Sequence, residues 1–198
     1  MATFCAVSLI LPCESSMVTC LVSEIVELTR IEGDPLAQKT EVVRIGEIIN
    51  ETASDYRLEA EVRGCSIQLQ GQLPGEVSGD PELLRRAMEN VLRNAIRYSP
   101  QDEVINVALT QTAKAATITI RDCGPGVPPE ALPEIFKPFF RVEESRDAES
   151  GGMGLGLSIA KRAVQMHQGE ITAQNAGPGL CVQILIPLID GIDFISST

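Results

Sequence analysis

The chain has 198 residues, 44% of them hydrophobic, and a formal net charge of −11 from 27 acidic and 16 basic side chains. This length and composition fit one globular domain with an additional segment, or two small domains. The acidic balance argues against a nucleic-acid or membrane-surface binder, which needs a basic face. An anionic ligand would therefore have to be bound by local basic residues and backbone dipoles.

Cysteine and histidine usage narrows the chemistry further. The 6 cysteines are scattered without Cys-x-x-Cys spacing and there is 1 histidine, so a zinc site is not expected. Scattered thiols in an acidic chain fit a reducing cytoplasm better than a disulfide scaffold, which predicts a cytoplasmic location. The apolar stretch Met1–Cys13 lacks a basic leader and contains Pro12, so it predicts neither a targeting signal nor a membrane contact.

The N-terminal part divides into two segments. Residues 1–16 show no clear pattern and are expected to be irregular. Residues 17–34 are predicted to form a helix, because an apolar stripe precedes the helix-ending Gly33-Asp34-Pro35. The stripe consists of Met17, Leu21, Ile25 and Leu28. It could dock on the following domain or pair with a partner helix, and both possibilities stay open.

The next predicted elements are short. An extended piece at Glu41–Val43 precedes a helix whose buried face runs from Ile45 to Tyr56 and which Arg63-Gly64 ends. A half-buried strand is predicted at Ser66–Gln70, where hydrophobic and polar residues alternate. Val77 indicates a further short strand.

A helix with a well-defined start follows. Asp80 can cap it, Pro81 suits its first position and Glu82 is favourable at the positive end of its dipole. Ser99-Pro100 ends it. The predicted buried stripe is Leu84, Ala87, Met88, Val91, Leu92 and Ala95.

The C-terminal half contains more strands and glycines. Strands are predicted at Val104–Leu109 and Ala116–Arg121, and residues 124–153 form a connection whose length is typical of a lid or a disordered loop. The glycine-rich residues 151–156 lead into a helix. Its predicted buried face is Ile159, Ala160, Ala163, Val164 and His167. A strand pair follows at Glu170–Gln174 and Leu180–Ile186, and then a tail at 189–198.

These elements together predict an α+β fold. We expect a two-layer α/β sandwich, in which helices cover one face of a mixed, mostly antiparallel sheet, preceded by a helix.

One polar face of the helix after Asp80 suits a nucleotide. An asparagine carbonyl is a hard oxygen ligand for Mg²⁺, so Asn94 can hold the metal, while Asn90, one turn earlier, can orient waters or ligand. Arg97 can reach a phosphate, and Tyr98 can pack on a purine ring. The simpler interpretation of this face is a solvated surface.

Two glycine-containing stretches add the remaining contacts. Asp122, at a strand end, can accept a hydrogen bond from an adenine amino group, with Gly124 and Gly126 making room for the base. The glycine-rich loop at 151–156 allows close backbone approach, and the N-terminus of the following helix favours phosphate. Taken singly, each stretch is better explained as a turn. Their joint occurrence in one chain favours a nucleotide site.

Four motifs resemble those of bacterial sensor histidine kinases. Residues 89–99 resemble the N box, 122–126 the G1 box, 135–141 the F box and 152–157 the G2 box. The motifs occur in the order of the family, and the resemblance covers about residues 40–188. The stretch Arg146–Gly156 is closest to the envelope-stress kinases of this family.

The resemblance implies a Bergerat (GHKL) fold that binds ATP with Mg²⁺. Asn94 would hold the metal, Asp122 would bind adenine, and the residues between Gly126 and Gly152 would form an ATP lid, with Arg141 near the phosphates. The full implied set of ATP-binding residues is Asn90, Asn94, Arg97, Tyr98, Asp122, Gly124, Gly126, Arg141, Gly152, Gly154, Leu155, Gly156 and Leu157.

The resemblance also implies domains and partners. Residues 35–188 would be the ATP-binding catalytic domain and 17–34 the remnant of a dimerisation helix. The phosphoacceptor histidine of the family lies on another dimerisation helix, and no matching motif occurs here. We therefore expect a histidine-containing dimerisation domain in trans, a response regulator downstream, a possible homodimer and a membrane-anchored parent kinase. His167 is expected to be a packed or capping residue.

Two other functions stay open. The chain could be a nucleotide-binding regulatory module without kinase turnover. It could also be a serine kinase resembling anti-sigma factors, which share the fold, although the F box favours the histidine kinase form.

Overall fold

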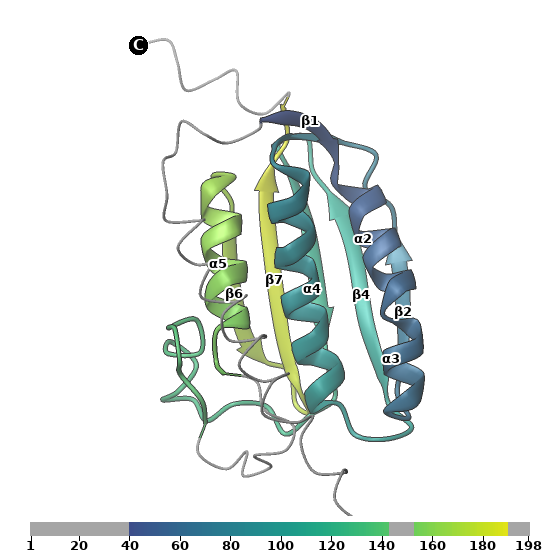
Figure 1. Ribbon diagram of the computed structural model, residues 1–198, viewed down its shortest axis with the longest axis vertical. Coiled ribbons are helices and arrows are strands. Elements are labelled where there is room, and N and C mark those ends of the chain that lie inside the picture. The colour runs from purple at the N-terminus through teal and green to yellow at the C-terminus, as the bar shows by residue number, and fades with distance from the viewer. Residues whose placement is uncertain (1–39, 143–152, 190–198) are drawn as a thin grey trace, which may run out of the picture. The chain divides into compact units, whose positions relative to one another are not determined.

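A computed structural model describes residues 40–142 and 153–189 of the chain (Figure 1). The predictions for residues 1–16, for the helix at 17–34 and for the tail beyond residue 189 lie outside the described residues.

Five strands form the main sheet, in the order β2-β4-β5-β7-β6. Their bounds are Ser66–Gly71 for β2, Val104–Gln111 for β4, Ala115–Arg121 for β5, Glu170–Asn175 for β6 and Leu180–Pro187 for β7. β2 pairs in parallel with β4, and the other neighbouring pairs are antiparallel, which confirms the predicted mixed sheet. Because β5 lies at the centre, the residues that follow it emerge between β4 and β7.

Helices cover one face of this sheet. Figure 1 shows α4 (Pro81–Tyr98) in the middle, with α2 (Ile45–Asp55) on one side and α5 (Gly156–Met166) on the other. Alternate strand residues such as Ile105, Ile118 and Ile184 are fully buried beneath the helices. This arrangement confirms the two-layer α/β sandwich predicted from the sequence.

Helix α4 forms as its sequence predicts. The Asp80 side chain accepts hydrogen bonds from the backbone N–H groups of Glu82 and Leu83, and Pro81 is the first helical residue. All six residues of the predicted stripe are buried, and Ile96 extends it.

The helix predicted from Ile45 to the glycine at position 64 is divided, which corrects the sequence prediction. α2 ends at Asp55 and α3 spans Arg57–Val62. Tyr56, at the junction, has a ψ of −1° and is tied to α4, because its hydroxyl accepts a hydrogen bond from Arg93 Nη2 at 2.7 Å. The backbone N–H of Tyr56 still donates to the Thr52 carbonyl oxygen at 3.1 Å, so the division is a local turn that hydrophobic periodicity does not show.

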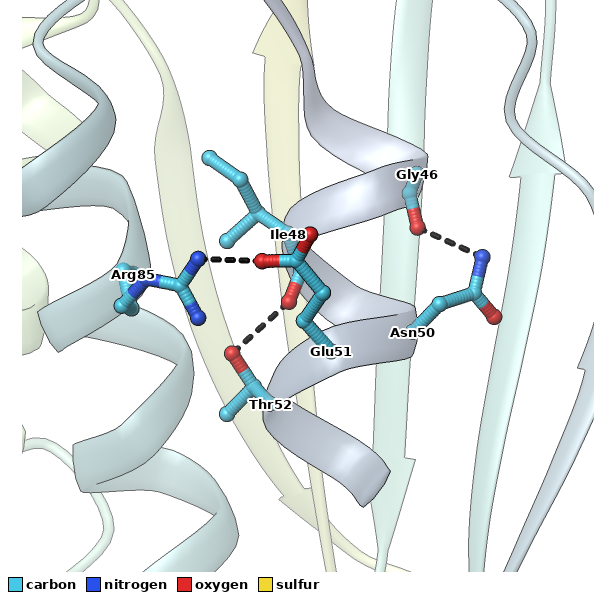
Figure 2. Close-up of polar contacts among 6 residues, drawn as sticks. All are labelled: Gly46, Ile48, Asn50, Glu51, Thr52 and Arg85. Atoms are coloured by element: carbon cyan, nitrogen blue, oxygen red, sulfur yellow. Dashed lines mark hydrogen bonds and ion pairs between the residues drawn. The ribbon is translucent and has the colours of Figure 1, made fainter. Parts of the chain in front are cut away.

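Polar contacts hold α2 in place (Figure 2). The Arg85 guanidinium of α4 forms an ion pair with Glu51 of α2. Within α2, Asn50 Nδ2 donates to the carbonyl oxygen of Gly46 at 2.8 Å, and Thr52 Oγ1 donates to that of Ile48 at 2.7 Å. The ion pair links α2 to α4 at the surface, whereas the two hydrogen bonds lie within α2, and the buried side chains of Ile45 and Ile49 pack α2 into the core.

A second, two-stranded sheet joins β1 (Glu41–Arg44) and β3 (Glu76–Gly79) in antiparallel pairing. β3 leads directly into the capping residue of α4, Asp80, whose backbone N–H donates to His167 Nε2 at 2.9 Å. The other ring nitrogen, Nδ1, carries the proton and donates to the carbonyl oxygen of Ala163 at 2.6 Å. His167 is buried, and this burial lowers its pKa below the ordinary value. It is therefore a packed residue, as predicted.

Candidate functional site

Asp122 lies directly after the central strand and is 4% exposed. Its Oδ1 atom accepts hydrogen bonds from the backbone N–H groups of Gly124, at 2.9 Å, and Leu180, at 3.0 Å. No donor among the described residues binds the other oxygen, Oδ2. Burial raises the pKa of this carboxyl, and the two N–H groups oppose that rise. The backbone thus orients the side chain and leaves one oxygen as an acceptor.

The loop after Asp122 passes against the C-terminal end of α4. A Cβ atom on Gly124 would lie 2.6 Å from the carbonyl oxygen of Tyr98, so the approach requires glycine. The Tyr98 side chain is 37% exposed, and the guanidinium carbon of Arg97 lies 5.6 Å from the centroid of its ring. Two predicted site segments, the end of α4 and the glycine loop after β5, therefore meet here.

The polar face of α4 also meets the start of α5. Asn90 Nδ2 donates to the carbonyl oxygen of Arg86 at 2.9 Å. A Cβ atom on Gly156, the first residue of α5, would lie 2.9 Å from Asn90 Oδ1. Asn94, one turn further along α4, is half-buried and makes no side-chain hydrogen bond within the described residues. Its amide is therefore available to a ligand beside this junction.

Within the described residues, no side chain caps the N-terminus of α5. Its N-cap is Leu155, whose side chain makes no capping bond, and its first turn contains no acidic residue. No side chain of the described residues thus competes with an anion for the first backbone N–H groups, in contrast to those of α4, which Asp80 caps. Leu155 is fully buried, and Leu157 packs partly buried against the core.

The residues before α5 contact the middle of the predicted lid. Gly154 has a φ of +74°, and a Cβ atom there would lie 2.6 Å from the carbonyl oxygen of Phe140. The backbone N–H of Phe139 donates to the Gly154 carbonyl oxygen at 2.9 Å. Arg141 is exposed near the end of this described part of the lid, and Gly152 lies outside the described residues.

Sequence reasoning missed Asn175. This residue was only part of a predicted connection between strands, yet its side-chain amide binds the backbone of Val127, beside Gly126. An asparagine before a Gly-Pro-Gly turn is a recognisable pattern. Only the sheet order shows that this turn meets the loop after β5.

His167 lies away from these groups. It contacts the N-terminal cap of α4, whereas Tyr98 is at the C-terminal end of the same 18-residue helix. A helix of that length spans about 27 Å. The histidine is therefore not part of the candidate site.

The assembled groups suit a nucleotide and a hydrated cation. Among the described residues there is no cluster of three or more His, Cys, Asp or Glu side chains that could hold a metal. An amide oxygen such as that of Asn94 fits Mg²⁺, which keeps several waters and takes further oxygens from phosphates. The donor set therefore accommodates a magnesium–phosphate complex better than an all-protein metal centre.

Comparison with known proteins identifies the class. Residues 79–190 match the family described as "Histidine kinase-, DNA gyrase B-, and HSP90-like ATPase". The chain belongs to this family. Its relatives include the sensor histidine kinase CpxA of Escherichia coli K12, which is 39% identical over 151 residues, covering 75% of this chain and 33% of that protein. The sensor histidine kinase CusS of the same strain is 30% identical over 167 residues, covering 84% and 35%.

Comparison with solved structures agrees with this family assignment. The mycobacterial sensor histidine kinase MprB superposes with a TM-score of 0.64 at 32% identity, covering 76% of this chain and 98% of that one. The catalytic domain of the histidine kinase ThkA superposes with a TM-score of 0.67 at 22% identity and supports the fold alone. The chain is thus an ATP-binding catalytic domain of the sensor histidine kinase type and resembles CpxA.

The chain spans about a third of the length of these curated relatives. Within the described residues, none of the helices combines the length and apolar character that crossing a membrane requires.

Proposed function

We propose that the chain binds ATP with Mg²⁺ between the polar face of α4, the loop after β5 and the start of α5. It then transfers the γ-phosphoryl group to a histidine outside these 198 residues. A dimerisation domain carries that histidine, and a response regulator receives the phosphoryl group downstream. The observation that carries the proposal is the buried Asp122 carboxylate, which the backbone holds through one oxygen only.

The adenine end of the ligand lies at Asp122. Its Oδ2 accepts a hydrogen bond from the adenine amino group, because Oδ1 is already bound by two N–H groups. Gly124 and Gly126 let the loop pack closely against Tyr98 and Asn175. This path brings the loop beside the base, and the Tyr98 ring packs against the base. A buried acceptor of this kind favours adenine over bases that lack the amino group, since an unpaired buried carboxylate is costly.

The phosphate end lies at the start of α5. The uncapped N–H groups after Leu155 and the backbone of Gly152, Gly154 and Gly156 bind the phosphates. Asn94 holds Mg²⁺, which neutralises phosphate charge, and Asn90 orients its water. Further ligand contacts come from Arg97, Arg141 and Leu157.

Catalysis in this arrangement is electrostatic. The acceptor imidazole nitrogen forms a bond to the γ-phosphorus while the bond to the bridging oxygen breaks and ADP leaves. The chain's part is to fix the triphosphate and to stabilise its charge with N–H dipoles and lid cations such as Arg141.

The remaining segments are assigned in the same way. Residues 35–188 form the ATP-binding domain, and 17–34 form a remnant of a dimerisation helix through which two chains can pair. We place the domain in the cytoplasm, where ATP is available, with the parent kinase anchored in the membrane as a further expectation.

The test is binding of a fluorescent ATP analogue with and without Mg²⁺. Asp122→Asn keeps an oxygen for the two N–H groups and replaces the second oxygen with a donor, so affinity should fall at least about tenfold. Asn94→Ala should abolish the effect of Mg²⁺. Asn50→Ala, on α2, is the control and should bind normally. Absence of binding in the unaltered chain would contradict the proposal.

A second candidate function is a nucleotide-binding module without phosphotransfer. It is favoured by the only histidine of the chain, which is buried with both ring nitrogens hydrogen-bonded. Incubation with ATP labelled in the γ-phosphate and an intact acceptor domain separates the two. Label on a histidine of the acceptor domain supports the kinase. ATP binding without any labelling supports the module, and label on serine would indicate a serine kinase.

A further inference from the structure

The turn that joins β6 and β7 is hydrogen-bonded to the loop after β5. Asn175, the last residue of β6, donates from Nδ2 to the carbonyl oxygen of Val127 at 2.6 Å and accepts at Oδ1 from the N–H of Val127 at 2.9 Å. One side-chain amide thus pairs with both backbone polar groups of a single residue, as a neighbouring strand would.

The same turn also holds the beginning of that loop. Leu180 makes two hydrogen bonds with Asp122. The Leu180 N–H donates to Asp122 Oδ1, and the Leu180 carbonyl oxygen accepts from the backbone N–H of Asp122 at 3.0 Å. Gly126, next to Val127, has a φ of +75°, and a Cβ atom there would lie 2.7 Å from Asn175 Oδ1. The loop at 122–127 is therefore fastened at its start by Leu180 and at its end by Asn175.

We propose that Asn175 is a positioning residue for the adenine end of the nucleotide site, an inference that rests on the proposed function. By fixing Val127, it holds Gly126 and Gly124 in the path that leaves space for the base. It acts through the loop and does not touch the ligand. The site thus depends on a residue that lies 48 positions from Val127 in the sequence.

The surroundings of Asn175 separate this role from a purely structural one. Asn175 is exposed, so water can reach the Val127 N–H and carbonyl groups when the amide is removed. The stability of the fold then changes little, while the loop at 122–127 becomes more mobile. Within the described residues, the hydrogen bonds of Asn175 involve no residue of α5, where the phosphates are proposed to bind. Its removal should therefore weaken base recognition and spare the phosphate contacts.

Three variants of the full chain test the proposal. Asn175→Ala removes both hydrogen bonds. Asn175→Asp keeps the size and the acceptor but places a second acceptor oxygen against the Val127 carbonyl, so it should fail as Ala does. Gln174→Ala changes the exposed neighbour on β6, leaves the two hydrogen bonds between Asn175 and Val127 intact and serves as the matched control.

The measurement compares the dissociation constants of Mg–ATP and Mg–GTP, together with the melting temperature without ligand. We expect both Asn175 variants to bind ATP about tenfold more weakly, as for the loss of hydrogen bonds that order a site. The weaker binding of GTP through its phosphates should stay unchanged, so adenine preference falls by the same factor. The melting temperature and the Gln174 variant should stay close to the unaltered chain.

Two results would overturn the inference alone: unchanged ATP affinity in Asn175→Ala, or an equal loss of ATP and GTP binding accompanied by a fall in melting temperature. If the unaltered chain bound no ATP, the proposed function itself would fail, which the first measurement distinguishes.

Discussion

Asp122 uses its two carboxylate oxygens differently. Oδ1 holds the backbone of the loop and of β7, whereas Oδ2 receives no hydrogen bond from the described residues. The motif around Asp122 was visible in the sequence. The different roles of the two oxygens were not, because Leu180, one of the two donors to Oδ1, comes from a strand that pairs with β5 only in the folded sheet.

This geometry predicts how nucleotide binding depends on pH. Burial raises the pKa of Asp122, and a proton would settle on Oδ2, since Oδ1 already accepts two N–H groups. Protonated Oδ2 loses its negative charge and carries an O–H donor, so it is a much weaker acceptor for the adenine amino group. ATP affinity should therefore be full above the raised pKa and should fall as the pH drops through it. Isothermal titration at several pH values checks this, and a similar fall in Asp122→Asn would contradict it.

Gly124 gives a second prediction at the scale of one residue. In Gly124→Ala the new Cβ would lie 2.6 Å from the Tyr98 carbonyl oxygen and 3.1 Å from Asp122 Oδ1, so the loop must shift. We expect a loss of about 1–3 kcal/mol in unfolding free energy, as for overpacking, and clearly weaker ATP binding. Urea denaturation and the fluorescent analogue measure these effects. Pro125→Ala, an exposed change in the same loop, should affect neither.

At the scale of elements, features that depend on local sequence were predictable, and features that depend on distant contacts were not. The start of α4 was predictable because Asp80, Pro81 and Glu82 act within one turn. The division of α2 from α3 at Tyr56 was not, because the predicted apolar face from Ile45 to Tyr56 gives no sign of a turn there. The parallel partner of β2 also required the sheet order, which no local pattern contains.

His167 joins three elements and makes their packing sensitive to pH. Nε2 accepts from Asp80 at the start of α4, Nδ1 donates to Ala163 of α5, and a Cβ atom on Gly79 of β3 would lie 1.9 Å from the ring. Protonation would remove the acceptor. Because burial lowers the pKa of His167 in the folded state, its stabilising contribution is complete above about pH 6.5, the unfolded value, and decreases as the pH falls toward the folded pKa.

We therefore expect His167→Gln to lower the unfolding free energy by about 1–3 kcal/mol near neutral pH, as for the loss of buried hydrogen bonds. The variant should also show a weaker dependence of stability on pH below about 6.5, where the imidazole of the unfolded chain takes up its proton. Urea denaturation followed by circular dichroism at several pH values measures both quantities. Identical pH slopes in variant and unaltered chain would contradict the assignment.

At the scale of the whole molecule, the candidate site joins segments that are distant in sequence. It takes the end of α4, the loop after β5 and the start of α5, and these elements belong to one α/β sandwich. Motif order predicted that these segments would meet. The turn at Asn175 that fastens one of them was outside every motif, because its role arises from the pairing of β5, β6 and β7.

Ligand binding should consequently stabilise the molecule as a unit. Mg–ATP at about 100 times its dissociation constant should add about 2.7 kcal/mol to the unfolding free energy, provided that the unfolded chain does not bind it. A thermal-shift measurement should show a higher melting temperature with Mg–ATP and a clearly smaller rise in Asp122→Asn at the same ligand concentration. Equal shifts in both chains would show that binding occurs elsewhere.

The contact of a single imidazole with α4, α5 and β3 also has a spectroscopic consequence. With 1 histidine in the chain, the one-dimensional proton NMR spectrum of the folded protein contains a single set of imidazole ring signals. Their chemical shifts report the environment between the N-terminal end of α4 and the C-terminal end of α5. An unlabelled sample can therefore reveal whether binding at the opposite end of α4 is felt at this junction.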